Sequence, residues 1–128
     1  MNITLWVLQA LLAVAFFAHG WLLLMPPAEI AAQMTAQLPR WFWVFLGWAE
    51  ILAGVGLTLP GMTRIMPGLV PAAAVGVMIV MISATVWHVV RAEYASAAIT
   101  AVLLAMSTYV AYARWRILPI HPRQAPAR

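Results

Sequence analysis

Four long apolar segments dominate this sequence and leave it few folds to adopt. Each contains between 17 and 23 residues, and they cover residues 3–25, 41–59, 67–89 and 97–113. A helix rises about 1.5 Å per residue, so segments of this length can cross a hydrocarbon core about 30 Å thick. We therefore expect an all-α protein: an antiparallel four-transmembrane-helix bundle over residues 1–118, with a basic, proline-containing tail at 119–128.

The composition agrees with a chain that has the lipid bilayer as its main partner. Two thirds of the residues (66%) are hydrophobic and 8% are charged, whereas soluble domains contain about 25% charged residues. The net charge of +4 is sparse and unclustered, so we expect no nucleic-acid partner. Because cysteine is absent, disulfides, thiolate metal sites and cysteine nucleophiles are excluded, and we expect no metal site.

The arginines predict how the chain is oriented. Four spans place both termini on one side of the membrane. That side holds five arginines and the other side holds two, which are Arg40 and Arg91. Cytoplasmic segments carry the excess of basic residues, so we expect cytoplasmic termini in a multi-pass protein of the cell (inner) membrane. The five are Arg64, Arg114, Arg116, Arg123 and Arg128.

Smaller sequence features predict local structure. In the loop at residues 26–40, Ile30, Met34 and Leu38 follow helical spacing, which predicts a short amphipathic helix on the outer surface or a lid over a cavity. Ser96 stands where it could cap the fourth helix. Gln9, inside the first apolar segment, is expected to make an interhelical hydrogen bond.

Glu50 is the main candidate for a functional group. It lies near the middle of the second apolar segment, where a charged side chain costs about 2.5 kcal/mol or more, so such residues usually face the bundle interior. Gly47 and Gly54 are three residues before it and four after it, and so share its helix face. An alternative role is structural, with a neutral Glu50 carboxyl bonded to a backbone carbonyl or to His19.

Two histidines accompany this carboxylate at the ends of neighbouring apolar segments. We expect His19 and His88 in the outer half of the bundle, above a cavity that opens outward with Glu50 at its floor. These three are the candidate catalytic residues, since proton transfer needs such groups within hydrogen-bond reach. Either histidine could instead be a satisfied structural group. The candidate substrate contacts are Trp48, Arg91, Tyr94, Thr100 and Ser107.

The order of these residues resembles the DoxX-like family of small four-helix membrane proteins over about residues 3–116. A glycine late in the first segment is followed by Gln-Leu-Pro at 37–39 and by Gly47-x-x-Glu50-x-x-x-Gly54-x-Gly-Leu, which runs to a proline. A His88-x-x-Arg91-x-Glu piece then ends the third segment. The resemblance implies an antiparallel four-helix fold with Glu50, His88 and Arg91 at family-typical positions.

The chain also departs from the family pattern. Where the family often has a lysine, one turn after the first-segment glycine, this chain has Leu23, and His19 is not part of the pattern. His19 is therefore a candidate replacement partner for Glu50. The family name derives from a subunit of a thiosulfate:quinone oxidoreductase, and animal relatives resemble assembly chaperones for membrane receptors.

Two classes of function remain open. The first is a small membrane enzyme that acts on an apolar small molecule, such as a quinone, terpenoid or epoxide, with Glu50 as general acid or base. The second is a non-catalytic oxidoreductase-associated or assembly subunit, either with a membrane oxidoreductase partner or as a homo-oligomer. A quinone is one candidate cofactor. Haem b, ligated by a histidine, is less favoured because the sequence has no haem motif.

Overall fold

The computed structural model describes residues 2–124, and this part of the chain is built from helices. Four of them are long and apolar enough to cross a membrane, which confirms the predicted all-α fold. The elements are α1 (Asn2–Leu24), α2 (Ala28–Gln37), α3 (Arg40–Thr63), α4 (Leu69–Val90), α5 (Tyr94–Tyr112) and a π-helical turn, η1 (Ala113–Ile117).

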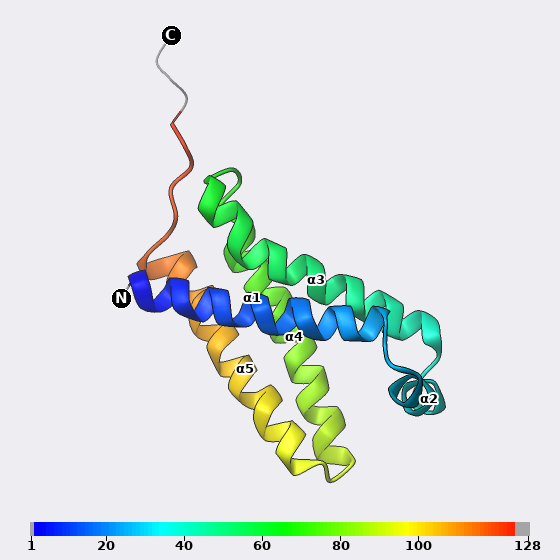
Figure 1. The fold of residues 1–128 in the computed structure, drawn as a ribbon. Coiled ribbons are helices and arrows are strands. Elements are labelled where there is room, and N and C mark those ends of the chain that lie inside the picture. Colours follow the sequence, from blue (N-terminus) through cyan, green and yellow to red (C-terminus); the bar gives the residue numbers. More distant parts are fainter. Residues whose placement is uncertain (1, 125–128) are drawn as a thin grey trace.

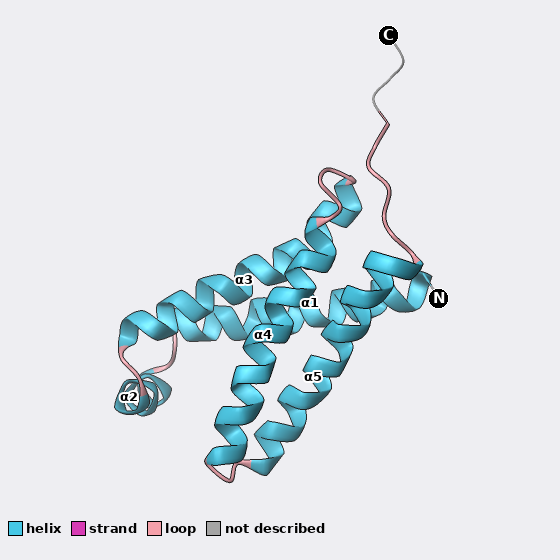
Figure 2. Cartoon of the chain, turned by 180° about the vertical axis from the view of Figure 1, so that it is seen from behind, coloured by secondary structure: helices cyan, strands magenta, loops and turns pink. Residues whose placement is uncertain are grey.

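The four long helices form two antiparallel pairs. Helix α1 packs along α3, α4 packs along α5, and α3 also contacts α4. Figure 1 shows the pairs meeting near the start of α1 and the end of α5, then diverging, so that α2 and the α4–α5 turn lie far apart. The view from behind shows the same divergence (Figure 2). The bundle is therefore closed at one end and splayed at the other.

Glycines bring α1 and α3 into backbone contact. A Cβ atom added to Gly20 would lie 2.7 Å from the carbonyl oxygen of Gly47, and one on Gly47 would lie 2.9 Å from that of Gly20. About two turns further along, a Cβ on Gly54 would lie 2.9 Å from the carbonyl oxygen of Ala13. Membrane helices use small residues in this way to pack closely. The glycine face predicted around Glu50 is confirmed.

The hydrophobic core lies where the two pairs converge. Its side chains come from all four long helices, and they include Leu5, Leu12, Leu57, Val77 and Val110, each at most 1% exposed. Large apolar side chains also cover the outer faces, for example Ile3, which is 81% exposed. Such a surface suits a chain surrounded by lipid tails.

The helix ends differ in detail from the prediction. Helix α3 continues past Pro60 to Thr63. Helix α5 begins at Tyr94, three residues earlier than expected, with Glu93 at the N-cap position. The cap predicted at Ser96 is therefore wrong, because that residue already lies within the first turn. The turn before α5 instead uses Ala92 in a left-handed conformation, at φ 57°.

The helix predicted between the first two spans is confirmed as α2. Its Met34 is buried, and the indole Nε1 of Trp43 donates to the carbonyl oxygens of Met34 (2.9 Å) and Leu38 (3.1 Å). Trp43 lies in the first turn of α3, so this side chain anchors the end of α2 to the start of the next span.

Candidate functional site

Glu50 and His19 form a hydrogen-bonded pair across the interface of α1 and α3. His19 Nδ1 lies 2.6 Å from Glu50 Oε2. The pair forms because Gly20 and Gly47 let the two backbones approach closely beside it. The Glu50 side chain is 3% exposed and that of His19 is 56% exposed. The carboxyl is enclosed, whereas the imidazole reaches the outside of the helix pair.

A groove of about 370 Å³ lies beside this pair, between α3 and α4. Phe16 of α1 contributes to its wall, and Glu50 is the one titratable residue among those that line it. Most of the remaining wall is made of small residues, and a Cβ atom added to Gly76 would meet nothing within 4 Å. The small lining residues are Ala49, Ala53, Gly56, Ala72, Ala73 and Gly76.

One oxygen of Glu50 remains available to the groove. Oε2 is bonded to His19, but Oε1 has no hydrogen-bond partner within residues 2–124. In the same part of the chain, the one fully enclosed side-chain polar atom without a partner is Nη2 of Arg114. Oε1 therefore keeps open surface. The carboxyl can bind His19 with one oxygen and a polar atom of a ligand with the other.

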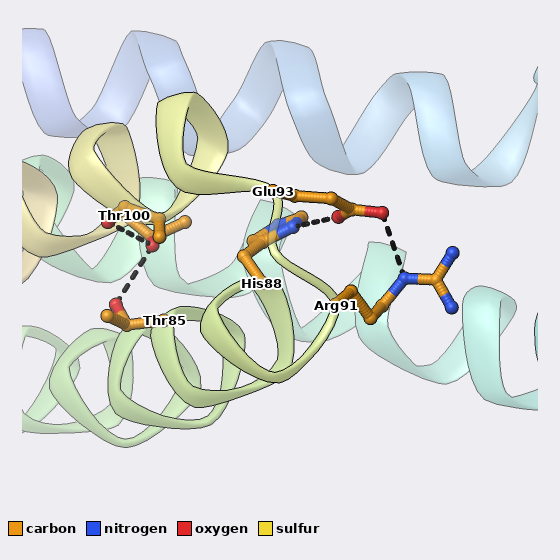
Figure 3. A network of polar contacts seen from close by, with 6 residues as sticks. Thr85, His88, Arg91, Glu93 and Thr100 are labelled. Carbon is orange, nitrogen blue, oxygen red and sulfur yellow. Dashed lines mark hydrogen bonds and ion pairs between the residues drawn. The ribbon is translucent and has the colours of Figure 1, made fainter.

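His88 belongs to a separate cluster at the α4–α5 turn (Figure 3). Its Nδ1 lies 2.6 Å from Oε2 of Glu93, and Nε of Arg91 donates to Oε1 of Glu93 at 2.9 Å. The His88-x-x-Arg91-x-Glu piece of the sequence thus forms one hydrogen-bonded cluster. The hydrogen bond with His88, and then that from Arg91, hold the pKa of Glu93 below its ordinary value. The guanidinium of Arg91 also lies 5.4 Å from the centre of the Trp87 ring.

The structure does not bring this cluster to Glu50. Within the described residues no hydrogen bond joins His88, Arg91 or Glu93 to the His19–Glu50 pair. In the described part of the chain, no third histidine or carboxylate joins the His19–Glu50 pair or the His88–Glu93 pair to form a possible metal site. The splay of the two helix pairs separates groups that the sequence assigned to one outward-opening cavity.

The other candidate substrate contacts also lie away from the groove lining. Thr100 and Thr85 place their hydroxyl oxygens 2.9 Å apart between α5 and α4, and the buried Ser107 donates to the carbonyl of Leu104 in its own helix. Trp48 and Tyr94 are 55% and 70% exposed on outer surfaces. Their proposed contact with a substrate stays a prediction.

A buried polar cluster near the closed end was only partly foreseen. The interhelical hydrogen bond predicted for Gln9 is confirmed, since its Nε2 donates to the carbonyl of Leu57 at 2.6 Å. Arg114, counted above among the five arginines on the side of the termini, is 4% exposed, and its Nε donates to Oε1 of Gln9 at 2.6 Å. Its Nη1 donates to Oδ1 of Asn2 at 2.9 Å, and its guanidinium stacks 5.1 Å from the Trp6 ring centre.

A cation also lies at the opposite end of α1, although the lysine typical of the family is absent. Leu23, which occupies that position, is buried. The guanidinium of Arg40 donates to the carbonyls of Leu23 (2.7 Å) and Leu24 (2.5 Å), the last residues of the helix. This charge compensates the negative end of the helix dipole.

Comparisons with known proteins agree with the resemblance. The DoxX-like family matches residues 7–110, which include all of α2, α3 and α4 and most of α1 and α5. No curated protein and no solved structure matches the chain. The four membrane-spanning helices and this match over most of its length identify the chain as a membrane protein that belongs to the DoxX-like family.

Proposed function

We propose that the groove between α3 and α4 binds an apolar small molecule from the bilayer, and that Glu50 exchanges a proton with its polar atom. The observation that carries this proposal is the single enclosed carboxyl in a groove whose other lining residues carry no titratable group. A buried ionisable residue in a membrane span is a functional-site hypothesis by default. We place the site in the cell (inner) membrane, with both termini in the cytoplasm.

The dimensions of the groove favour a narrow ligand. Its volume of about 370 Å³ is within the range of small-molecule sites, about 300–1,000 Å³. Small residues on both walls leave a slot suited to a flat ring or a narrow chain rather than a globular molecule. A quinone-like ring, a terpenoid or an epoxide, each apolar except for one or two oxygens, matches this shape and the single carboxyl.

The chemistry open to Glu50 is proton transfer. In its protonated form the carboxyl donates a hydrogen bond to a carbonyl or epoxide oxygen; in its ionised form it accepts one from a hydroxyl. His19 holds Oε2 and so orients the carboxyl. A positioned acid or base of this kind typically contributes about 10²–10⁴-fold to a rate.

The test fills the groove without disturbing the fold. Gly76→Val adds a side chain where a Cβ meets nothing, within the groove lining. Gly68→Val adds the same side chain at an equally open position just before α4, outside the lining, and serves as the matched control. Binding of a short-chain benzoquinone and of a farnesyl alcohol is measured by equilibrium dialysis in detergent micelles.

We expect wild type and Gly68→Val to bind one of these probes and Gly76→Val to lose most of that binding. Glu50→Gln should keep the fold and bind the probe, but lose turnover of any substrate found by comparing lipid extracts with and without the protein. Equal probe binding in Gly76→Val and wild type would contradict the site. Full turnover in Glu50→Gln would contradict the proton-transfer role.

The divergence of the two helix pairs favours a second candidate, a non-catalytic subunit or assembly factor of a membrane oxidoreductase. The splayed end presents faces of α1 and α4 that do not cover one another (Figure 1), and a partner helix could occupy the space. The two functions are distinguished by purification in mild detergent. An enzyme converts substrate alone, whereas a subunit is recovered in stoichiometric amounts with a partner.

A further inference from the structure

His19 and Glu50 connect two surfaces of the protein that are otherwise separate. The Glu50 carboxyl lines the α3–α4 groove, whereas His19 is absent from that lining. The imidazole is nevertheless 56% exposed and touches Oε2 of Glu50 through Nδ1. Its other ring nitrogen, Nε2, makes no hydrogen bond within residues 2–124. The pair thus extends from a ring nitrogen without a hydrogen bond on an exposed side chain to a carboxyl that lines the groove.

We propose that His19 is the proton port of this site, carrying protons between the medium outside α1 and the Glu50 carboxyl. The inference rests on the proposed function of the groove and adds the route by which the Glu50 carboxylate regains its proton. A purely structural hydrogen bond to Glu50 would use Nδ1 of His19 alone. A port requires both ring nitrogens, with one of them accessible.

The proton balance of the relay is simple. Nε2 of the neutral ring takes up one proton, and the Nδ1 proton of the resulting imidazolium passes to Oε2 of the Glu50 carboxylate. This leaves a neutral imidazole and a neutral carboxyl. Rotation of the carboxyl presents its proton to the groove, where the polar atom of the ligand takes it. Rotation of the half-exposed ring then brings Nδ1 to the medium, where Nδ1 takes up a proton and Nε2 releases one, which restores the Nδ1–H tautomer with no net proton change. One proton has then moved from the medium to the ligand.

The surroundings offer the carboxyl no competing route. The groove walls from α3 and α4, together with Phe16 of α1, contain no other titratable residue. The charged residue nearest in sequence on α3, Arg40, binds the carbonyls of Leu23 and Leu24. The His88–Arg91–Glu93 cluster is bonded within itself at the α4–α5 turn.

The position of His19 along α1 suits exchange with water. It lies five residues before the last residue of the helix, Leu24, which is about 7–8 Å at 1.5 Å per residue. Glu50 lies ten residues after the start of α3 at Arg40, about 15 Å by the same measure and close to the middle of a core about 30 Å thick. The imidazole therefore bridges from the interfacial layer toward the midplane.

The experiment follows hydrogen–deuterium exchange of the Glu50 carboxyl in the full-length protein. The carbonyl stretching band of a protonated carboxyl shifts in D₂O, and Glu50→Gln identifies which band belongs to Glu50. Rapid mixing with D₂O, recorded by time-resolved infrared spectroscopy, gives its exchange rate without any ligand. His19→Asn keeps an amide donor near the position of Nδ1 but has no second nitrogen, and His19→Phe removes both. His121→Phe, in the exposed segment after η1, is the control.

We expect exchange to slow by about a hundredfold in both His19 variants, at the lower end of what a positioned proton-transfer group contributes. Added imidazole should restore the rate in His19→Phe, and His121→Phe should match wild type. Unchanged exchange in His19→Asn, or no Glu50 band at any pH at which the protein is folded, overturns the relay. Probe binding to the groove is measured separately, so loss of the relay with binding intact leaves the proposed function standing.

Discussion

Nε of Arg114 and Oε1 of Gln9 lie 2.6 Å apart although 105 residues separate them in the chain. Gln9 in turn donates to the carbonyl of Leu57, so one chain of hydrogen bonds runs from η1 through α1 to α3. All of these groups are enclosed in protein at the end of the molecule where the helix pairs converge. The clasp formed by Arg114 and Gln9 fixes the closed end of the splayed bundle.

Removing one partner of this clasp should destabilise the fold. Gln9→Leu leaves Nε of the buried Arg114 guanidinium without its acceptor, which should lower the free energy of unfolding by about 2–3 kcal/mol. The measurement is denaturant unfolding in detergent micelles.

The exposed Arg116 supplies the control for the clasp, since Arg116→Met should change stability by less than about 0.5 kcal/mol. The double variant Gln9→Leu with Arg114→Met should lose less than the sum of the two single losses, because both side chains belong to one interaction. Strictly additive losses would mean that the two groups do not stabilise one another.

The close approach of α1 and α3 should be sensitive to a single methyl group. In Gly20→Ala the new Cβ would lie 2.7 Å from a backbone oxygen of Gly47, which a side-chain rotation cannot relieve. We expect a loss of about 1–3 kcal/mol of stability and a weaker His19–Glu50 hydrogen bond, seen as a shift of the Glu50 carboxyl infrared band. Gly68→Ala, at an open position, should change neither quantity.

The carboxyl of Glu93 should titrate below its ordinary value of 4.5. The His88 hydrogen bond lowers the pKa most, followed by that of Arg91, and both favour the ionised form. Because the folded-state pKa is depressed, the stabilisation is present above pH 4.5 and is lost as the pH falls through the folded-state value. Carboxyl ¹³C NMR measures the midpoint, which should rise in both Arg91→Met and His88→Ala. An unmoved midpoint in both variants would refute the assignment.

The arginine distribution predicts cytoplasmic termini. A fluorescent protein fused after residue 128 should fluoresce, and alkaline phosphatase at the same site should be inactive. Active phosphatase at this position would reverse the orientation and place the α4–α5 turn on the cytoplasmic side. The fusion site itself lies outside residues 2–124, which the structure describes.

The spans and the main polar pair could be predicted because each depends on local pattern. Length and hydropathy determine the helices, and the cost of burying Glu50 in lipid requires a partner such as His19. The misplaced start of α5 has a local cause as well. Ala92 adopts a left-handed conformation, so the chain reverses direction within a few residues and α5 begins at Tyr94. Neither alanine at position 92 nor serine at position 96 is a sequence signal for this early start.

The grouping of the remaining residues could not be predicted because depth along a helix does not determine distance between helices. His88 and Glu50 were expected to share one outward-opening cavity, yet Glu50 lines the α3–α4 groove whereas His88 is absent from that lining and bonds Glu93. Arg114 shares a helical stripe with Ser107 and Ala111, both buried, which could have indicated its inward position. Its charge was interpreted as a topology signal instead. The π-helical turn from Ala113 is a tertiary feature without a sequence signature.

The rim of the α3–α4 groove has a practical consequence for anyone who assays this protein. Leu52 and Leu69 stand at its edge, 66% and 45% exposed, on faces that a bilayer would cover. A ligand entering there arrives by lateral diffusion in two dimensions, so occupancy depends on its mole fraction in the membrane and not on its molarity in the buffer. Doubling the lipid at fixed ligand and volume should therefore lower occupancy as effectively as removing half the ligand.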